Sequence, residues 1–164
     1  MNESINLNDF ISQGCIGRGS FGKVYKVKNK KSGEIFAAKV SNDDILDFKI
    51  KGEVNIISKL NHPSILKYIG FSPIDFRKRA RPVIITEYAS NGTLENLILN
   101  ERNKNNITSF DDTRKLIIIY GIASSMSYLH SHNIIHGDLK PANILIDDFL
   151  FPKIADFGLS KVKK

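Results

Sequence analysis

The sequence has one cysteine, no long hydrophobic run and fewer acidic than basic residues. Because Cys15 is the single cysteine, no intramolecular disulfide can form. Such low cysteine content is typical of a protein from a reducing compartment. The longest apolar run, residues 116–120, is far shorter than the ~20 residues that cross a bilayer. The start, residues 1–4, lacks the basic and apolar parts of a signal peptide. We therefore expect a soluble cytoplasmic protein without a membrane segment.

The composition is that of a folded protein with an excess of positive charge. Its 164 residues are enough for one compact domain, or for two small lobes that share a cleft. Hydrophobic residues make up 41% and charged residues 25%, which excludes a disordered or collagen-like chain. The net charge of +7 suits a partner that carries phosphate, without naming one.

Hydrophobic periodicity predicts a chain of mixed strands and helices. Period-2 alternation marks strands, and 3.6-residue spacing marks helices. The expected strands cover residues 25–28, 34–40, 66–70 and 82–88, and the expected helices cover residues 44–60, 94–98 and 111–131. In the second of these strands Ala37 and Lys39 share one face, because side chains alternate across a strand.

The last helix is unusually apolar. Ser109 and Asp112 resemble a capping box at its start, and the polar stretch 100–106 before it is expected to be a loop. Its expected core stripe is Ile119, Ile122, Ala123, Met126 and Leu129. Residues 116–118 add apolar side chains on other faces, so this helix needs cover on more than one side.

Residues 17–22 form a G-x-G-x-x-G pattern, which alone is weak evidence for a phosphate site. A P-loop is excluded because Val24 stands where a hydroxyl must reach Mg²⁺. A Rossmann loop is excluded because a strand, not a helix, follows the glycines. A strand–turn–strand flap over phosphates fits both flanks, and a glycine-rich hairpin without a ligand is the alternative. Cys15, just before the glycines, is expected to be a small buried filler, and a reactive thiol is the alternative.

The basic stretch 77–81, Arg-Lys-Arg-Ala-Arg, lies between two expected strands. We expect a solvated hairpin tip there. A patch for phosphate or nucleic acid is the alternative, although no aromatic residues interleave as base stacking would require.

Four further motifs, together with the glycine loop, resemble those of the protein kinase family. Residues 36–39, Phe-Ala-Ala-Lys, look like the V-A-I-K of the family's third strand, and Glu53 looks like the glutamate that pairs with its lysine. Residues 136–143, His-Gly-Asp-Leu-Lys-Pro-Ala-Asn, resemble the catalytic loop H-R-D-L-x-x-x-N, and residues 156–158 are Asp-Phe-Gly. The resemblance extends over residues 10–161.

The resemblance implies an α+β, two-lobed protein-kinase-like fold. Residues 10–88 would form the small antiparallel β lobe with its helix, and residues 89–164 the first part of a mainly helical large lobe. Residues 1–164 would then be a single, incomplete kinase domain, since the chain ends soon after Gly158 and the A-P-E segment is absent. The apolar residues 116–119 are therefore expected to form an exposed patch on a poorly stable chain.

The resemblance also implies the cofactors, ATP and Mg²⁺, and the residues that bind them. Asp138 would accept the hydrogen of the substrate hydroxyl, Lys140 would approach the γ-phosphate, and Lys39, held by Glu53, would bind the α- and β-phosphates. Asn143 and Asp156 would be the Mg²⁺ ligands. The expected nucleotide contacts, beside Lys39, are Ile16, Gly17, Gly19, Gly22, Val24, Ala37, Glu87, Ala89 and Leu145. Ile57, Tyr68, His136 and Phe157 look like the family's regulatory spine.

The implied activity is that of an ATP-dependent serine/threonine protein kinase acting on a protein substrate. Lys140 supports this class. Thr86 and the sequence of residues 84–88, Ile-Ile-Thr-Glu-Tyr, instead favour the tyrosine-kinase-like branch. The alternative is a nucleotide-binding regulatory module without catalysis. No nucleic-acid partner is expected, because the chain carries no known reading element.

One residue of the catalytic loop departs from the family pattern. Gly137 stands where the family usually has an arginine that pairs with a phosphate on the activation loop. The departure implies that the parent protein does not depend on phosphorylation of that loop.

Overall fold

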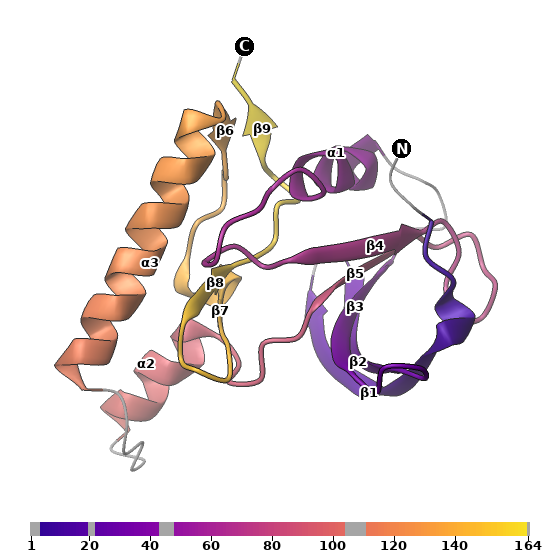
Figure 1. The fold of residues 1–164 in the computed structure, drawn as a ribbon, viewed down its shortest axis with the longest axis horizontal. Helices are drawn as coiled ribbons and strands as arrows, with labels where there is room; N and C mark the ends of the chain where they lie inside the picture. The colour runs from indigo at the N-terminus through magenta and orange to yellow at the C-terminus, as the bar shows by residue number, and fades with distance from the viewer. Residues whose placement is uncertain (1–3, 20–21, 43–47, 104–110, 164) are drawn as a thin grey trace. The chain divides into compact units, whose positions relative to one another are not determined.

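A computed structural model describes residues 4–19, 22–42, 48–103 and 111–163, and these form two compact units. The first unit comprises Met1–Leu60 and Lys67–Tyr88, and the second comprises Asn61–Leu66 and Ala89–Lys164. Figure 1 shows strands gathered in the first unit and two helices with short strand pairs in the second. The α+β class predicted from the sequence is confirmed.

The first unit is a five-stranded antiparallel sheet with one helix. In sheet order the strands are β1 (Phe10–Gly19), β2 (Gly22–Asn29), β3 (Ile35–Ser41), β5 (Val83–Glu87) and β4 (Tyr68–Ser72). A short 3-10 helix, η1 (Leu7–Asp9), precedes the sheet, and the helix α1 (Phe48–Ile57) follows β3. The helix predicted at residues 44–60 is thus present, although residues 43–47 lie outside the described part of the chain.

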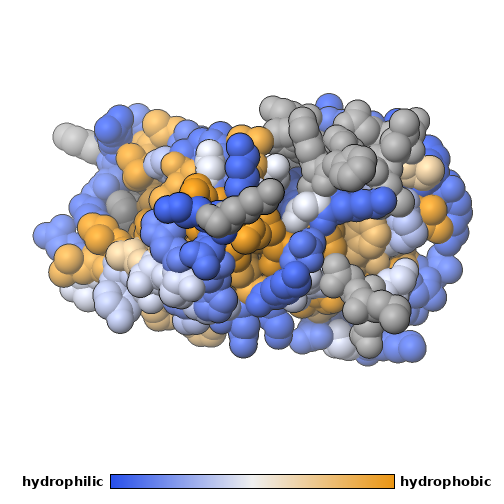
Figure 2. All heavy atoms as spheres, turned by 90° about the horizontal axis from the view of Figure 1, so that it is seen from above, coloured by the Kyte–Doolittle hydropathy of each residue, from blue (hydrophilic) through white to orange (hydrophobic). Residues whose placement is uncertain are grey.

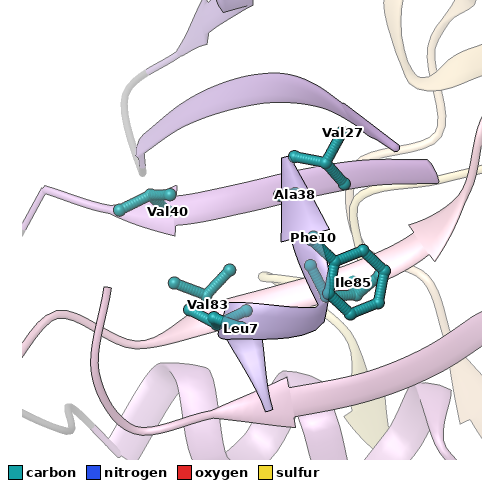
Figure 3. Packing of buried hydrophobic residues seen from close by; sticks show 7 residues of the cluster. All are labelled: Leu7, Phe10, Val27, Ala38, Val40, Val83 and Ile85. Carbon is teal, nitrogen blue, oxygen red and sulfur yellow. The ribbon is translucent and has the colours of Figure 1, made fainter. Parts of the chain in front are cut away.

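One face of this sheet forms the hydrophobic core of the first unit. Ala38 and Val40 of β3 lie in it, and Figure 3 shows how they pack with their neighbours. The complete buried cluster is Leu7, Phe10, Val27, Ala38, Val40, Val83 and Ile85. Ala37 and Lys39, which alternate with these residues, lie on the opposite face of β3, as the period-2 pattern predicted.

The second unit is built around two helices and two strand pairs. Its helices are α2 (Leu94–Arg102) and α3 (Asp112–Ser131). Its antiparallel pairs are β6 (Ile134–Ile135) with β9 (Lys161–Val162), and β7 (Ile144–Ile146) with β8 (Pro152–Ile154). The 3-10 turn η2 (Pro141–Asn143) leads directly into β7. Gly121 lets α3 approach β8, since a Cβ there would lie 2.5 Å from Cγ of Pro152.

Two predictions about the ends of these helices are wrong. The stretch 100–106 is not wholly a loop, because α2 continues to Arg102; residues 104–106 lie outside the described residues. The cap of α3 is Asp111, whose side chain accepts a hydrogen bond from the backbone N–H of Arg114. Ser109, the expected cap, also lies outside the described residues.

Helix α3 buries one face and exposes another that is equally apolar. Ile118, Gly121, Ser125 and Leu129 are buried. Ile119, expected in the core, is 62% exposed, and Ala123 is exposed as well, so that part of the predicted stripe is wrong. Of the predicted apolar patch at residues 116–119, Leu116 is 66% exposed and Ile117 37%, but Ile118 is buried, so the prediction is correct only in part. Figure 2 shows hydrophobic side chains reaching the surface among hydrophilic ones. Even so, the described residues include no helix long and apolar enough to cross a membrane.

Candidate active site

The glycine-rich hairpin joins β1 and β2. Gly17 pairs with Val24 and Gly19 with Gly22, so the strand–turn–strand arrangement predicted from the sequence is present. Ser20 and Phe21 lie outside the described residues. A Cβ on Gly22 would lie 2.2 Å from the backbone oxygen of Val40, whereas a Cβ on Gly19 would meet nothing within 4 Å. Packing therefore requires glycine at position 22, and it leaves the backbone open to a ligand at position 19.

Two residues near this hairpin are exposed. Ile16, a predicted nucleotide contact, is 49% exposed on β1. Cys15 is also exposed, so the expectation of a buried filler is wrong. A register shift on each side of Cys15 interrupts the pairing of β1 with β2, and the thiol donates to the carbonyl of Gly17 at 3.3 Å. The strand alternation that predicts burial therefore does not hold at this residue.

The predicted lysine–glutamate pair is present on the face of the sheet opposite the core. Lys39 Nζ lies 2.9 Å from Oε1 and 3.2 Å from Oε2 of Glu53. Glu53 comes from α1 and is only 8% exposed, while Lys39 is 24% exposed. A buried carboxylate needs such a partner, because an unpaired charge in a protein interior is strongly destabilising. The pair fixes the ammonium group on one face of β3.

Two other predicted nucleotide contacts of the first unit, Val24 and Ala37, share this face. Val24 of β2 lies opposite Lys39, and Ala37 lies opposite Thr86 of β5. The carbonyl of Glu87 accepts a hydrogen bond from the Thr86 hydroxyl at 3.1 Å. The Glu87 carboxylate accepts one from the backbone N–H of Lys67 at 2.8 Å, which ties the start of β4 to the end of β5.

The catalytic-loop residues of the second unit converge on one carboxylate. Oδ2 of Asp138 accepts hydrogen bonds from Nζ of Lys140 at 2.8 Å and from Nδ2 of Asn143 at 2.9 Å. Asn143 Nδ2 also bonds the backbone carbonyl of Asp138 at 2.8 Å. The amide nitrogen of Asn143 donates both of its hydrogen bonds to Asp138. The amide oxygen of Asn143 is therefore the atom that can bind a metal.

These contacts set the ionisation of the two charged groups. The hydrogen bond from Lys140, followed by that from Asn143, holds the pKa of Asp138 below its ordinary value of 3.8. The same bond raises the pKa of Lys140 above 10.5. At neutral pH the site therefore holds a carboxylate that can accept a hydrogen and an ammonium group that can bind phosphate.

His136 supports the loop from beneath. It is buried, Nε2 lies 3.0 Å from the carbonyl of Ala155, and Nδ1 accepts the backbone N–H of Asp138 at 3.3 Å. Burial lowers the pKa of His136. A neutral ring with its proton on Nε2 satisfies both contacts. Phe157 stacks edge-on against the ring, with the centroids 4.9 Å apart.

The Asp-Phe-Gly segment lies next to Asn143 in the same unit. The backbone N–H of Ala155 donates to the carbonyl of Asn143 at 2.9 Å, directly before Asp156. Asp156 has a φ of 61°, a left-handed conformation that is uncommon outside glycine. Asn143 and Asp156 offer two hard oxygen ligands, a set that fits Mg²⁺ bound mainly through phosphates. The described residues hold no cluster of three or more His, Cys, Asp or Glu side chains that could bind a metal alone.

The remaining predicted residues lie in both units. Leu145 is in β7, where it bridges to Thr93, and Ala89 begins the second stretch of the second unit. Of the four spine residues, His136 and Phe157 contact each other in the second unit. Ile57 of α1 is buried in the first unit, and Tyr68 of β4 belongs to that unit too.

The sequence did not predict the contacts made by the segment after Gly158. A Cβ on Gly137, whose φ is 84°, would lie 2.6 Å from the carbonyl oxygen of Leu159. The Ser160 hydroxyl donates to the carbonyl of His136 at 2.9 Å. The glycine that replaces the family's arginine was the one available signal, because glycine is favoured where φ is positive and the backbone is approached closely.

Comparisons with known proteins show the family to which this chain belongs. The model of the protein kinase domain matches residues 10–164. Over 163 residues the chain is 36% identical to an Aurora kinase of Saccharomyces cerevisiae, covering 96% of this chain and 42% of the relative. It is 35% identical over 159 residues to cysteine-rich receptor-like protein kinase 7 of Arabidopsis thaliana, covering 94% of this chain and 23% of the relative. The chain thus spans less than half of each of these relatives, and it belongs to the protein kinase family.

Proposed function

We propose that this chain carries the catalytic machinery of a serine/threonine protein kinase, which transfers the γ-phosphoryl group of ATP to a protein hydroxyl. The observation that carries the proposal is the convergence of Lys140 and Asn143 on the Asp138 carboxylate. Phosphoryl transfer asks the protein for positioning and charge neutralisation more than for covalent chemistry. A hydrogen-bonded carboxylate beside an ammonium group meets both needs.

The proposed roles follow from these contacts. The Asp138 carboxylate accepts the proton of the substrate hydroxyl while that oxygen bonds to phosphorus and the bond to the leaving ADP breaks. Lys140 neutralises charge on the transferred group, and serine/threonine specificity is proposed from its position two residues after Asp138. Lys39, held by Glu53, binds the other phosphates. Asn143 and Asp156 hold Mg²⁺, which neutralises phosphate charge when bound.

Binding and catalysis need separate measurements. We expect MgATP to raise the melting temperature of the wild-type chain, because a ligand that binds only the folded state stabilises it. Asp138→Asn keeps the shape of the side chain but removes the negative charge. We expect it to retain the thermal shift and to lower phosphate transfer to a serine/threonine peptide library by about 10²–10⁴-fold.

Asp112→Asn is the matched control, because the Asp112 side chain is 99% exposed at the start of α3. It should leave both measurements unchanged. Transfer by Asp138→Asn at the wild-type rate would contradict the proposed role. Transfer is measured on the full-length parent protein, because residues 1–164 lack the A-P-E segment of the family. A parent protein that binds MgATP but transfers no phosphate would instead support the non-catalytic nucleotide-binding module.

A further inference from the structure

The positive charge of this protein is concentrated in its first unit. The sequence of that unit has 15 Lys and Arg residues against 9 Asp and Glu, which leaves +6. The second unit has 9 against 8, which leaves +1, so together they give the +7 of the whole chain. Residues 77–81, which connect β4 to β5, hold four of the 15 cations within five positions.

A buried carboxylate shapes this basic loop, residues 77–81. Asp75 is 3% exposed, and its Oδ1 accepts the backbone N–H groups of Arg77 at 2.8 Å and Arg79 at 3.0 Å. Its Oδ2 accepts Nε of Arg79 at 2.8 Å and lies 2.6 Å from Nη2. The backbone N–H of Asp75 donates in turn to the carbonyl of Arg79 at 3.0 Å. One side chain therefore fixes the path of the loop backbone.

The basic loop is also anchored at both ends and along one side. Phe76 packs against the hydrophobic core of the first unit, and Pro82 is fully buried. Nζ of Lys78 donates to Oδ1 of Asn8 at 3.1 Å, which joins the loop to η1. Residues 77–80 between these anchors are exposed. The loop thus presents Arg77, Lys78 and Arg79 to solvent from a backbone that is already ordered.

We propose that the basic loop is a docking site for an acidic segment of a partner protein, independent of phosphoryl transfer. Residues 75–81 carry four positive charges and one negative charge, which leaves a local excess of three. The exposed Arg77 has a planar guanidinium group that matches a carboxylate in a bidentate geometry, whereas the guanidinium of Arg79 already pairs with Asp75. A fixed backbone lowers the entropy lost on binding, so a small charged surface can be specific. The loop lacks the aromatic side chains that stack on single-stranded bases.

The probe for this proposal is a fluorescein-labelled twelve-residue peptide of alternating Glu and Asp with glycine spacers, followed by fluorescence anisotropy. We expect Arg77→Glu with Lys78→Glu to weaken binding about tenfold or more, since two attractive contacts become repulsive. The matched control is Lys51→Glu with Lys59→Glu on and just after α1, where both lysines are exposed. This control changes the net charge by the same amount as the loop variant, and it should weaken binding of the peptide less than about threefold.

Asp75→Asn separates a shaped site from a general attraction between charges. It makes the protein more positive, so attraction by net charge alone predicts tighter binding of the peptide. A site shaped by Asp75 predicts weaker binding, because the Arg79 side chain and the loop backbone lose their anchor. Circular dichroism checks that the variant folds, and the charge-reversal pair tests the proposal independently if it does not.

Three results would overturn the proposal. The first is equal loss of binding in the loop variant and in the α1 control. The second is no measurable binding of the peptide by the wild-type chain at low salt. The third is tighter, loop-dependent binding of a single-stranded oligonucleotide or of phosphatidylserine vesicles than of the peptide, which would assign the basic loop to another class of partner.

Discussion

Lys39 and Glu53 can be separated experimentally into a structural and a nucleotide-binding contribution. Lys39→Met alone leaves a carboxylate that is 8% exposed without its partner, and breaking such a pair costs about 3–5 kcal/mol. The double variant Lys39→Met with Glu53→Gln removes both charges, so we expect it to recover most of that loss. Urea unfolding measures this, and thermal shift with MgATP should show no nucleotide binding in either variant. A double variant as unstable as the single one would show that the pair does not act through charge.

The glycines of the hairpin are a second residue-scale test, because they differ in what surrounds them. Gly22→Ala places a Cβ 2.2 Å from the backbone oxygen of Val40, so we expect a loss of stability of about 1–3 kcal/mol. Gly19→Ala meets nothing within 4 Å and should change stability by less than about 0.5 kcal/mol. If the hairpin covers phosphates, Gly19→Ala should still weaken MgATP binding. Equal destabilisation by both variants would contradict this difference.

At the scale of single residues, the sequence predicted which residues form the candidate site better than it predicted which side chains are buried. The motif spacing identified Asp138, Lys140 and Asn143, and the structure brings them together. The exposure of Cys15 could not be predicted, because it depends on the register shifts that flank it in β1. Such irregularities follow from how two strands fit together, and neither strand's own sequence encodes them.

Among the elements, the segment after the Asp-Phe-Gly motif is held to the catalytic loop by neutral contacts. Ser160 bonds the carbonyl of His136, and the backbone N–H of Lys163 bonds the carbonyl of Asn133 at 2.7 Å. Strands β6 and β9 pair in the same region. Gly137 makes room for the segment, since its missing Cβ would press on Leu159.

Gly137→Ala should therefore speed hydrogen exchange in the segment after Gly158 by more than the backbone strain at position 137 alone would explain. The matched variant is Gly33→Ala, because Gly33 also has a positive φ, 76°, but a Cβ there would lie 3.8 Å from Lys28 Cε. The left-handed conformation costs about 1–2 kcal/mol in both variants. Only Gly137→Ala should also speed hydrogen exchange at the amides of Ser160 and Lys163. Unchanged exchange at these two amides would show that the close approach to Leu159 is not needed.

Helices and strands were predictable where their periodicity was strong, and less so at their ends. The strand that contains Ala37 and the helix after Asp111 lie where alternation and spacing placed them. Helix α2 runs through polar residues to Arg102, because Thr93 caps its start and Leu94 and Leu97 bury one face. The polar composition of its last turn was misread as a loop. Ile119 was misassigned because a helix that is apolar on several faces gives no signal for the buried one.

On the scale of the whole molecule, stability should depend on pH through the buried His136 and the partly buried His62. Burial lowers the pKa of His136 and of His62 below 6.5. The folded protein therefore keeps these rings neutral at a pH where the unfolded chain takes up protons. The stabilisation is fully present above about pH 6.5 and is lost progressively as the pH falls below that value, because the unfolded state then binds more protons.

Urea unfolding followed by circular dichroism at pH 7.5, 6.5 and 5.5 measures this dependence. Each histidine contributes at most about 1.4 kcal/mol per pH unit. We expect His136→Gln to reduce the slope below pH 6.5, even though it also lowers stability at pH 7.5 by disturbing the bond to Ala155. His130→Gln, at an exposed position near the end of α3, is the matched control and should leave the slope unchanged. An identical slope in the wild type and in His136→Gln would mean that His136 takes up its proton without unfolding, and its ring would then have to give up one of its two hydrogen bonds in the folded protein.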